Sequence, residues 1–217
     1  MRNELVFYTH PMSRGRIARW MLEELGQPYR TEVLDYGTTM KSPAYLAINP
    51  MGKVPALRHG DTVVTECAAI CAYLADAFPE GQLAPAPANR LRGPYYRWLF
   101  FIAGPLEHAA TNKAFGFEVP DDRKGMAGYG SLSDVVSTLE GALTGRDYIV
   151  GDRFSAADVY LGSHVGWGMQ FGTIERRPAF ERYWARLSAR PAAVRAKEID
   201  DGLAPAHSHP VPKATRS

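Results

Sequence analysis

Three side-chain hydroxyls gather near the N-terminus, where a short apolar run gives way to a helical pattern. Tyr8 ends the apolar run "ELVFY", Thr9 opens the following loop, and Ser13 precedes the segment "RGRIARWMLEELG". A hydroxyl can donate a hydrogen bond to an anion, and the N-terminus of a helix adds partial positive charge. Because both favour the charged form of an acidic group, this loop is a candidate site for holding an anion.

A lysine and an acid–cysteine pair mark a second group of candidate binding residues. Lys53 stands before Val54 and Pro55 in "INPMGKVPAL", and Glu66 with Cys67 opens the helical stretch "TECAAICAYL". A lysine, an acid and the N–H groups of a helix start can together hold the charged ends of one small peptide. Taken alone, the lysine is equally a solvated surface residue, and the acid is equally a favourable neighbour of a helix N-terminus.

The two cysteines allow a redox alternative but no disulfide framework. A helix N-terminus lowers the pKa of a thiol, so Cys67 is a candidate thiolate, whereas Cys71 one turn later is predicted to be a small core residue. A bridge between two cysteines four residues apart on one helix has poor geometry. The cysteine usage therefore favours a reducing, cytoplasmic setting.

Composition excludes several classes of protein. The chain has 217 residues, a net charge of +2 and interspersed charges, which argues against a nucleic-acid-binding protein. No apolar run is long enough for a signal peptide or a membrane span, so no membrane association is predicted. His207 and His209 form an isolated H-x-H pattern without further ligands nearby in sequence, and no metal site is predicted.

The elements that must position these residues change character near residue 80. Up to there, the pattern predicts β-α-β-α-β-β-α, including a hairpin over "VPALRHGDTVVTE" and a helix N-cap at Ser13. The stretch "PEGQLAPAPANR" marks a linker, and the later segments have helical spacing. We therefore predict an α/β domain, a linker, an all-helical domain and a disordered tail, over residues 1–80, 81–88, 89–204 and 205–217 respectively.

In four segments, taken in order, the sequence resembles the soluble glutathione transferase family. These segments are "SRGRIARWMLEELG", "AINPMGKVPAL", "TECAAICAYLADAF" and "VGDRFSAADVYLGS". The first of them is most similar to the bacterial and fungal branch that has Ser-Arg at the start of the first helix. The resemblance implies a thioredoxin-like domain that binds glutathione, followed by a helical bundle that supplies much of the second-substrate pocket.

The resemblance also implies how glutathione is held. A cis peptide between Val54 and Pro55 would present the Val54 backbone to the cysteinyl unit of glutathione, and Lys53 would meet a carboxylate. Glu66 would hold the γ-glutamyl ammonium, and the Cys67 N–H would bind the neighbouring carboxylate. Most relatives have serine where this chain has Cys67, and a thiol is the weaker donor, so this contact is expected to be weaker.

For catalysis, the resemblance implies that glutathione is held as a thiolate. Ser13, beside Arg14, matches the serine of the branch that the chain resembles, and Tyr8 and Thr9 remain alternatives. Arg14 would either add positive potential or be a surface arginine. The loop contains no cysteine, which favours activation of bound thiolate over a mixed disulfide with the enzyme.

The predicted function is attack of the glutathione thiolate on a hydrophobic electrophile. The alternatives are a glutathione-dependent peroxidase, disulfide reductase or isomerase, and a glutathione- or ligand-binding protein without turnover. The predicted partners are glutathione as co-substrate and a second copy of the chain, since the family implies a homodimer. For the second-substrate pocket the candidates are Tyr95, Tyr96, His108 and Trp167.

Overall fold

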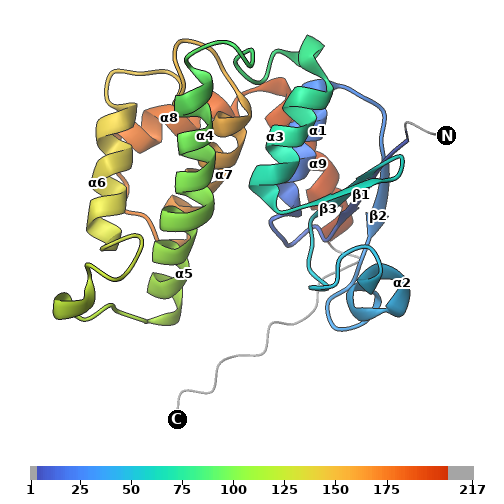
Figure 1. Cartoon of the computed structure of the whole chain (residues 1–217), viewed down its shortest axis with the longest axis horizontal. Helices are drawn as coiled ribbons and strands as arrows, with labels where there is room; N and C mark the ends of the chain where they lie inside the picture. The colour runs from blue at the N-terminus through green and yellow to red at the C-terminus, as the bar shows by residue number, and fades with distance from the viewer. Residues whose placement is uncertain (1–3, 205–217) are drawn as a thin grey trace.

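In the computed structural model, which describes residues 4–204, a mixed sheet with its helices lies beside a helical bundle (Figure 1). The strands are β1 (Leu5–Thr9), β2 (Arg30–Val33), β3 (Ala56–His59) and β4 (Thr62–Thr65). The α-helices are α1 (Gly15–Leu25), α2 (Pro43–Leu46), α3 (Cys67–Ala77), α4 (Arg92–Phe101), α5 (Glu107–Phe115), α6 (Leu132–Leu143), α7 (Ala156–Phe171), α8 (Pro178–Ser188) and α9 (Pro191–Leu203). This order confirms the predicted thioredoxin-like domain followed by a helical domain. The predicted tail over 205–217, with its two histidines, lies outside the described residues.

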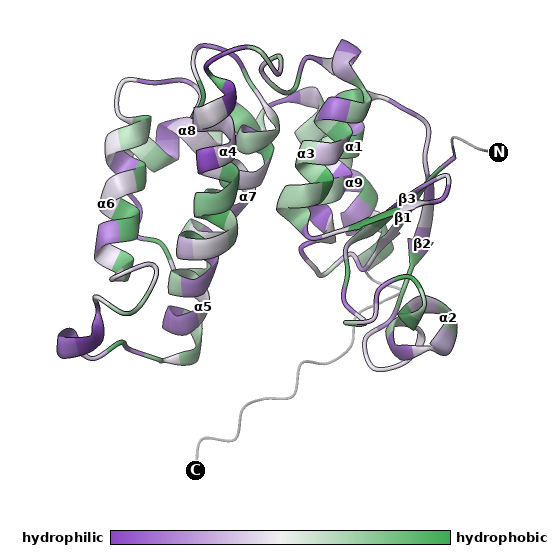
Figure 2. Ribbon diagram, in the orientation of Figure 1, coloured by the Kyte–Doolittle hydropathy of each residue, from purple (hydrophilic) through white to green (hydrophobic). Residues whose placement is uncertain are grey.

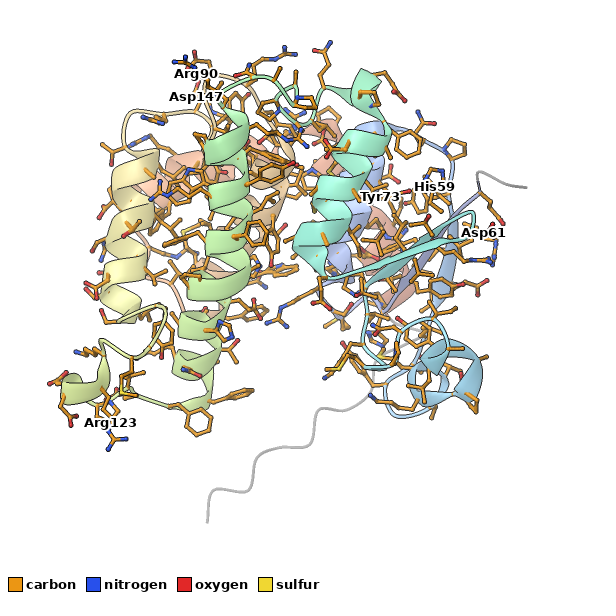
Figure 3. The ribbon with its side chains drawn as sticks, viewed as in Figure 1. His59, Asp61, Tyr73, Arg90, Arg123 and Asp147 are labelled. Atoms are coloured by element: carbon orange, nitrogen blue, oxygen red, sulfur yellow. The ribbon has the colours of Figure 1, made fainter. Side chains whose placement is uncertain are left out.

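The four strands form one sheet in the order β2-β1-β3-β4. β1 runs parallel to β2 and antiparallel to β3, and the predicted hairpin joins β3 to β4. Because side chains alternate along a strand, Leu5 and Phe7 join the main core with α1 and α3, while Val6 and Tyr8 join a smaller cluster. A hydrogen bond of 2.9 Å between His59 Nδ1 and the Tyr73 hydroxyl ties β3 to α3, and Figure 3 shows the two side chains together.

Helix α1 ends at a glycine cap, and its N-cap lies one residue later than predicted. Gly26 takes the C-cap position with a φ of 65°, a left-handed conformation that glycine adopts without a Cβ penalty. At the other end Arg14, not Ser13, occupies the N-cap position, and its side chain makes no capping bond. Ser13 Oγ nevertheless accepts a hydrogen bond of 2.9 Å from the Gly15 N–H, so it still satisfies one N-terminal donor.

The helical domain is built around α7, which is buried along most of its length. Figure 2 shows that apolar residues also cover much of α3, whereas hydrophilic residues are frequent on α5 and α6. Between α4 and α5 a π-helical segment, Ile102–Leu106, accommodates Pro105 within the otherwise continuous helix. None of the helices described over residues 4–204 is long and apolar enough to cross a membrane.

Helices α7 and α9 join the two domains. α7 packs against α1 and α3, and α9 lies along α1. The Arg19 Nε atom of α1 donates to Asp200 Oδ1 of α9 over 2.8 Å, and both side chains are 1% exposed. Arg19 also donates to Tyr29 and Thr31, which spreads its charge over several acceptors. A buried pair of this kind is weak evidence for stability, but it fixes where α9 sits on α1.

A capping box at the start of α7 extends into a larger network. Asp158 Oδ2 accepts from the Ser155 backbone N–H and from the Ser155 hydroxyl, each at 2.9 Å. Its Oδ1 accepts from the Ile149 N–H and from the Tyr183 hydroxyl, each at 2.8 Å. Burial raises the pKa of Asp158 to about 6 although these four bonds favour the carboxylate. The side chain therefore links α7, α8 and the loop before α7.

We predict that Asp158→Ala destabilises the protein by roughly 3 kcal/mol or more, because four buried donor groups lose their acceptor. Chemical denaturation of the variant and the wild type measures the difference in unfolding free energy. Because the pKa of Asp158 is raised in the folded state, the contribution of this carboxyl group to the free energy of unfolding depends on pH. It is largest below about pH 4 and declines as the pH rises towards 6.

A matched control is available in α6, where the Ser131 hydroxyl donates to the Asp134 carboxylate and accepts from the Asp134 N–H at an exposed position. Asp134→Ala is expected to cost about 1 kcal/mol or less. Equal losses in the two variants would show that the buried network adds nothing to the local cap.

Candidate functional site

A cavity of about 1150 Å³ opens between the N-terminus of α1, the loop before β3 and helices α5 and α7. Its N-terminal wall includes Ser13, Arg14, Tyr36, Lys53 and Val54. Its helical wall carries polar and aromatic side chains, among them Glu107, Ser163, His164, Trp167 and Trp184. The cavity thus lies between the two domains and draws its lining from both.

Of the three candidate hydroxyl residues, Ser13 is the one that lines this cavity. Tyr8 is buried in the smaller cluster with Met40 and Tyr45, its ring 5.6 Å from that of Tyr45. Thr9 is fully buried, and its Oγ1 has no hydrogen-bond partner among the described residues. The fold therefore turns the other two hydroxyls away from the space that a ligand can occupy.

Local hydrogen bonds set the position of the Ser13 hydroxyl. It donates to the His10 carbonyl over 2.6 Å and accepts from the Gly15 N–H over 2.9 Å. The chain is tight here, because a Cβ on residue 15 would lie 2.0 Å from Thr9 Oγ1. Glycine at position 15 thus lets the start of α1 approach β1 closely. To bind an anion, the Ser13 hydroxyl must exchange the His10 carbonyl for the ligand.

Tyr36 is a further hydroxyl at this wall that the sequence analysis did not single out. It lies between β2 and α2 and is partly exposed to the cavity. Burial raises the pKa of Tyr36, while a hydrogen bond from Ser13 and the charge of Arg14 act in the opposite direction. No local pattern indicates this residue, since its place beside Ser13 depends on how the loop after β2 folds back.

The segment 53–55 belongs to the same N-terminal wall of the cavity as Ser13 and Tyr36. Lys53 is exposed and lines the cavity together with the half-buried Val54, and the peptide between Val54 and Pro55 is cis, as the resemblance implied. The Lys53 carbonyl accepts from the Tyr45 hydroxyl at 2.6 Å and from Asn49 Nδ2 at 2.8 Å. Two buried donors thus hold the backbone while the lysine side chain stays free to meet a ligand.

Glu66 and Cys67 begin α3 close to the start of α1. Glu66 has a φ of 68° and ψ of 124°, a costly conformation for a residue with a Cβ. Such strain is found where the backbone must present particular groups, which supports a binding role for this corner. The Cys67 thiol donates to the Arg14 carbonyl at a distance of 3.6 Å, so its side chain links α3 to α1.

The environment of Cys67 opposes the redox alternative. The side chain is 7% exposed, and burial raises the pKa of the Cys67 thiol to about 12, although the charge of Arg14 lowers it. Burial also raises the pKa of Cys71, and both cysteines are free. At neutral pH each is a protonated thiol rather than a nucleophilic thiolate.

Among the four residues predicted for the second-substrate pocket, Trp167 lines the cavity and the other three do not. The spacing of α4 turns Tyr95 into the core with Trp98 and Leu99, leaving it 0% exposed. Tyr96 lies on the outer side of the same helix, and His108 is exposed, with Nδ1 2.8 Å from the Gly104 carbonyl oxygen. The cavity wall instead uses Trp20 and Trp184, which lie on α1 and α8.

Glu107 and His164 are polar residues of this wall that the sequence analysis did not identify. Glu107 forms an ion pair with Arg14, and its Oε2 lies 3.6 Å from His164 Nδ1. Burial lowers the pKa of His164 to about 4 despite the opposing charge of Glu107, so the imidazole is neutral at pH 7. Residues 4–204 contain no group of three or more histidine, cysteine or acidic side chains that could hold a metal ion.

Comparison with known proteins identifies the family. The family model for the glutathione S-transferase N-terminal domain matches residues 12–77, and the model for the C-terminal domain matches residues 122–191. A glutathione S-transferase of Xanthomonas campestris is 31% identical over 203 residues, covering 90% of this chain and 98% of the relative. The chain belongs to the glutathione S-transferase family.

Solved structures of family members agree with this assignment over both domains. A glutathione transferase from Methylococcus capsulatus superposes with a TM-score of 0.76 at 32% identity, covering 91% of this chain and 98% of that one. A sphingomonad glutathione S-transferase, solved in complex with glutathione, gives a TM-score of 0.74 at 30% identity, covering 90% and 98%. The relationship therefore extends across the cavity between the domains.

We predict that neither cysteine reacts readily with iodoacetamide in the native protein at pH 8, because the thiolate form of each is disfavoured by burial. Mass spectrometry of the alkylated chain measures the labelling, and the same chain in denaturant serves as the control that both thiols can react. Native labelling of Cys67 as fast as in the denatured chain would restore it as a reactive thiolate.

Proposed function

We propose that the protein is a glutathione transferase in which Ser13 holds the glutathione sulfur as a thiolate. The observation that supports this role is that Ser13, unlike Tyr8 and Thr9, lines the cavity shared with Lys53 and Val54. A free thiol titrates near 8.5, so only a few per cent is ionised at pH 7. A hydroxyl donor at the N-terminus of α1 stabilises the anion and raises that fraction.

Glutathione would extend from Ser13 along the loop before β3 to the start of α3. The Val54 backbone would pair with the cysteinyl unit, and Lys53 would meet a carboxylate. Glu66 would hold the γ-glutamyl ammonium, while the N–H of Cys67 would bind the neighbouring carboxylate. Because the Cys67 thiol donates to the Arg14 carbonyl, this corner would act through its backbone and through Glu66.

The reaction would be attack of the thiolate on an electrophilic carbon. The sulfur forms the new bond with its electron pair, and a leaving group departs with the electrons of the bond that breaks. The second substrate would lie against Trp167, with Trp20 and Trp184 further along the cavity. This aromatic wall suits a hydrophobic electrophile.

Four further features belong to the same proposal. The Ser-Arg pair before α1 supports membership of the branch with that motif, and the bounds of α3 and α4 support domain limits at 1–80, 81–88 and 89–204. Assembly as a homodimer is supported by the exposed aromatic residues Tyr96 and Phe100 on α4, the latter 73% exposed. The two free cysteines are compatible with the predicted cytoplasmic location.

The central experiment is Ser13→Ala. Conjugation of glutathione to an aryl halide is expected to fall roughly 10–100-fold at pH 6.5, because the bound thiol loses its donor and its pKa rises by one to two units. Binding of glutathione, measured by calorimetry, is expected to persist. Unchanged conjugation by the variant would show that Ser13 is not the hydroxyl that stabilises the thiolate. If the wild type binds glutathione but turns over no aryl halide, organic peroxide or mixed disulfide, the protein is a carrier.

The proposed contacts to the charged ends of glutathione predict weaker binding in Lys53→Ala and Glu66→Ala. Each variant loses one charge-assisted hydrogen bond, for which we expect about a 10-fold increase in the dissociation constant. Lys124→Ala and Glu175→Ala, exposed residues of the helical domain, are the matched controls. Equal affinity in test and control variants would remove these two residues from the binding site.

A further inference from the structure

The helical domain places one carboxylate against the residue that follows Ser13. Glu107, the first residue of α5, forms an ion pair with the Arg14 guanidinium across the domain boundary. Thr111 lies one turn further along α5, and its hydroxyl donates to the same carboxylate oxygen, Oε1, over 3.5 Å. The second oxygen, Oε2, faces His164 on α7. The carboxylate is thus held from three directions.

The pair is asymmetric in its exposure. The Arg14 side chain is 53% exposed, whereas that of Glu107 is 26% exposed and backed by α5 and α7. Exposed ion pairs contribute little to stability, so the pair is not explained as a structural support. An exposed arginine that pairs with a more buried carboxylate instead has a defined position at the cavity wall next to Ser13.

We propose that Glu107 is a positioning residue that holds the Arg14 guanidinium beside the glutathione sulfur and partly offsets its positive charge there. This inference rests on the proposed function, since it concerns the sulfur held by Ser13. Arg14 favours the thiolate, and Glu107 both fixes Arg14 in place and reduces its effect. The helical domain thereby adjusts the reactivity of a thiol that the N-terminal domain binds.

A thiol already present near this place shows the sign of each charge. Cys67 lies against the Arg14 carbonyl, and beyond the dominant effect of burial, Arg14 lowers the pKa of Cys67 while Glu107 raises it. Glu66 acts in the same direction as Glu107. A glutathione sulfur beside Ser13 meets the same opposed charges.

Four titratable groups around this site do not change charge near neutral pH. His164 is neutral, and burial raises the pKa values of Tyr36, Tyr160 and Cys67, so these groups stay protonated. The charged side chains that line the cavity are Arg14, Arg16, Lys53, Glu107, Lys197, Asp200 and Asp201. Of these, Glu107 is the carboxylate that contacts Arg14.

The test is the pH dependence of Glu107→Gln, which removes the charge but keeps the size and one acceptor oxygen. The thiolate of bound glutathione is followed by its ultraviolet absorbance between pH 5 and 9, and kcat/KM with an aryl halide is measured over the same range. The acid limb of both profiles is expected to move down by roughly 0.5–1 pH unit, because Arg14 is no longer offset. A merely structural role for Glu107 would lower activity without this shift.

Arg14→Met removes the positive charge instead. The acid limb of both pH profiles is expected to move up by a similar amount in this variant. A variant that only disturbs folding would not give shifts of opposite sign in the two proteins. Glu140→Gln is the matched control, because Glu140 also pairs with an arginine, Arg177, but lies outside the cavity lining. Its profile is expected to match that of the wild type.

The outcomes separate this inference from the proposed function. If the wild type binds and conjugates glutathione but Glu107→Gln shows no shift, or shifts upward, the role of Glu107 is overturned and the function stands. If calorimetry shows no glutathione binding by the wild type, the function and the inference both fail. An equal shift in Glu140→Gln would show that the shift comes from the change in the net charge of the protein, and it would also overturn the role of Glu107.

Discussion

The burial of α1 between the sheet and the helical domain is the constraint on which the rest of the structure depends. β1 and α3 cover this helix from the N-terminal domain, and α7 and α9 cover it from the other. Its interior positions, from Ile17 to Leu22, are therefore buried on nearly all sides, which includes the arginine at position 19. Its N-terminal end opens onto the cavity between the domains.

This arrangement explains why the cavity has two chemically different walls. The wall from the N-terminal domain consists of loop residues that hydrogen bonds and tight packing hold close to β1, such as Ser13 and the Lys53–Pro55 segment. The other wall consists of side chains that project from rigid helices, with Trp167 and His164 on α7. A loop can place donors around a small charged ligand, whereas helices offer a broad apolar surface to a second molecule.

Two acidic side chains, Asp158 and Glu107, differ in burial and therefore in what they do. Asp158 is fully buried and makes four hydrogen bonds, so it secures the start of α7, the helix that carries Trp167 and His164 of the cavity wall. The Arg14–Glu107 pair is partly open to solvent and contributes little to stability, but it lies where charge affects a bound sulfur. Burial separates the acid that supports the fold from the acid that can influence chemistry.

Patterns local in the chain were enough to recognise the two-part architecture, the β-hairpin and the candidate segments around Ser13, Lys53 and Glu66. Each depends on residues within a few positions of one another, where spacing and backbone preference act directly. The choice among Tyr8, Thr9 and Ser13, the inward turn of Tyr95, and the meeting of Arg14 with Glu107 and His164 required the folded chain. Those outcomes depend on which face of a strand or helix is buried and on contacts between distant segments, and one-dimensional spacing does not contain that information.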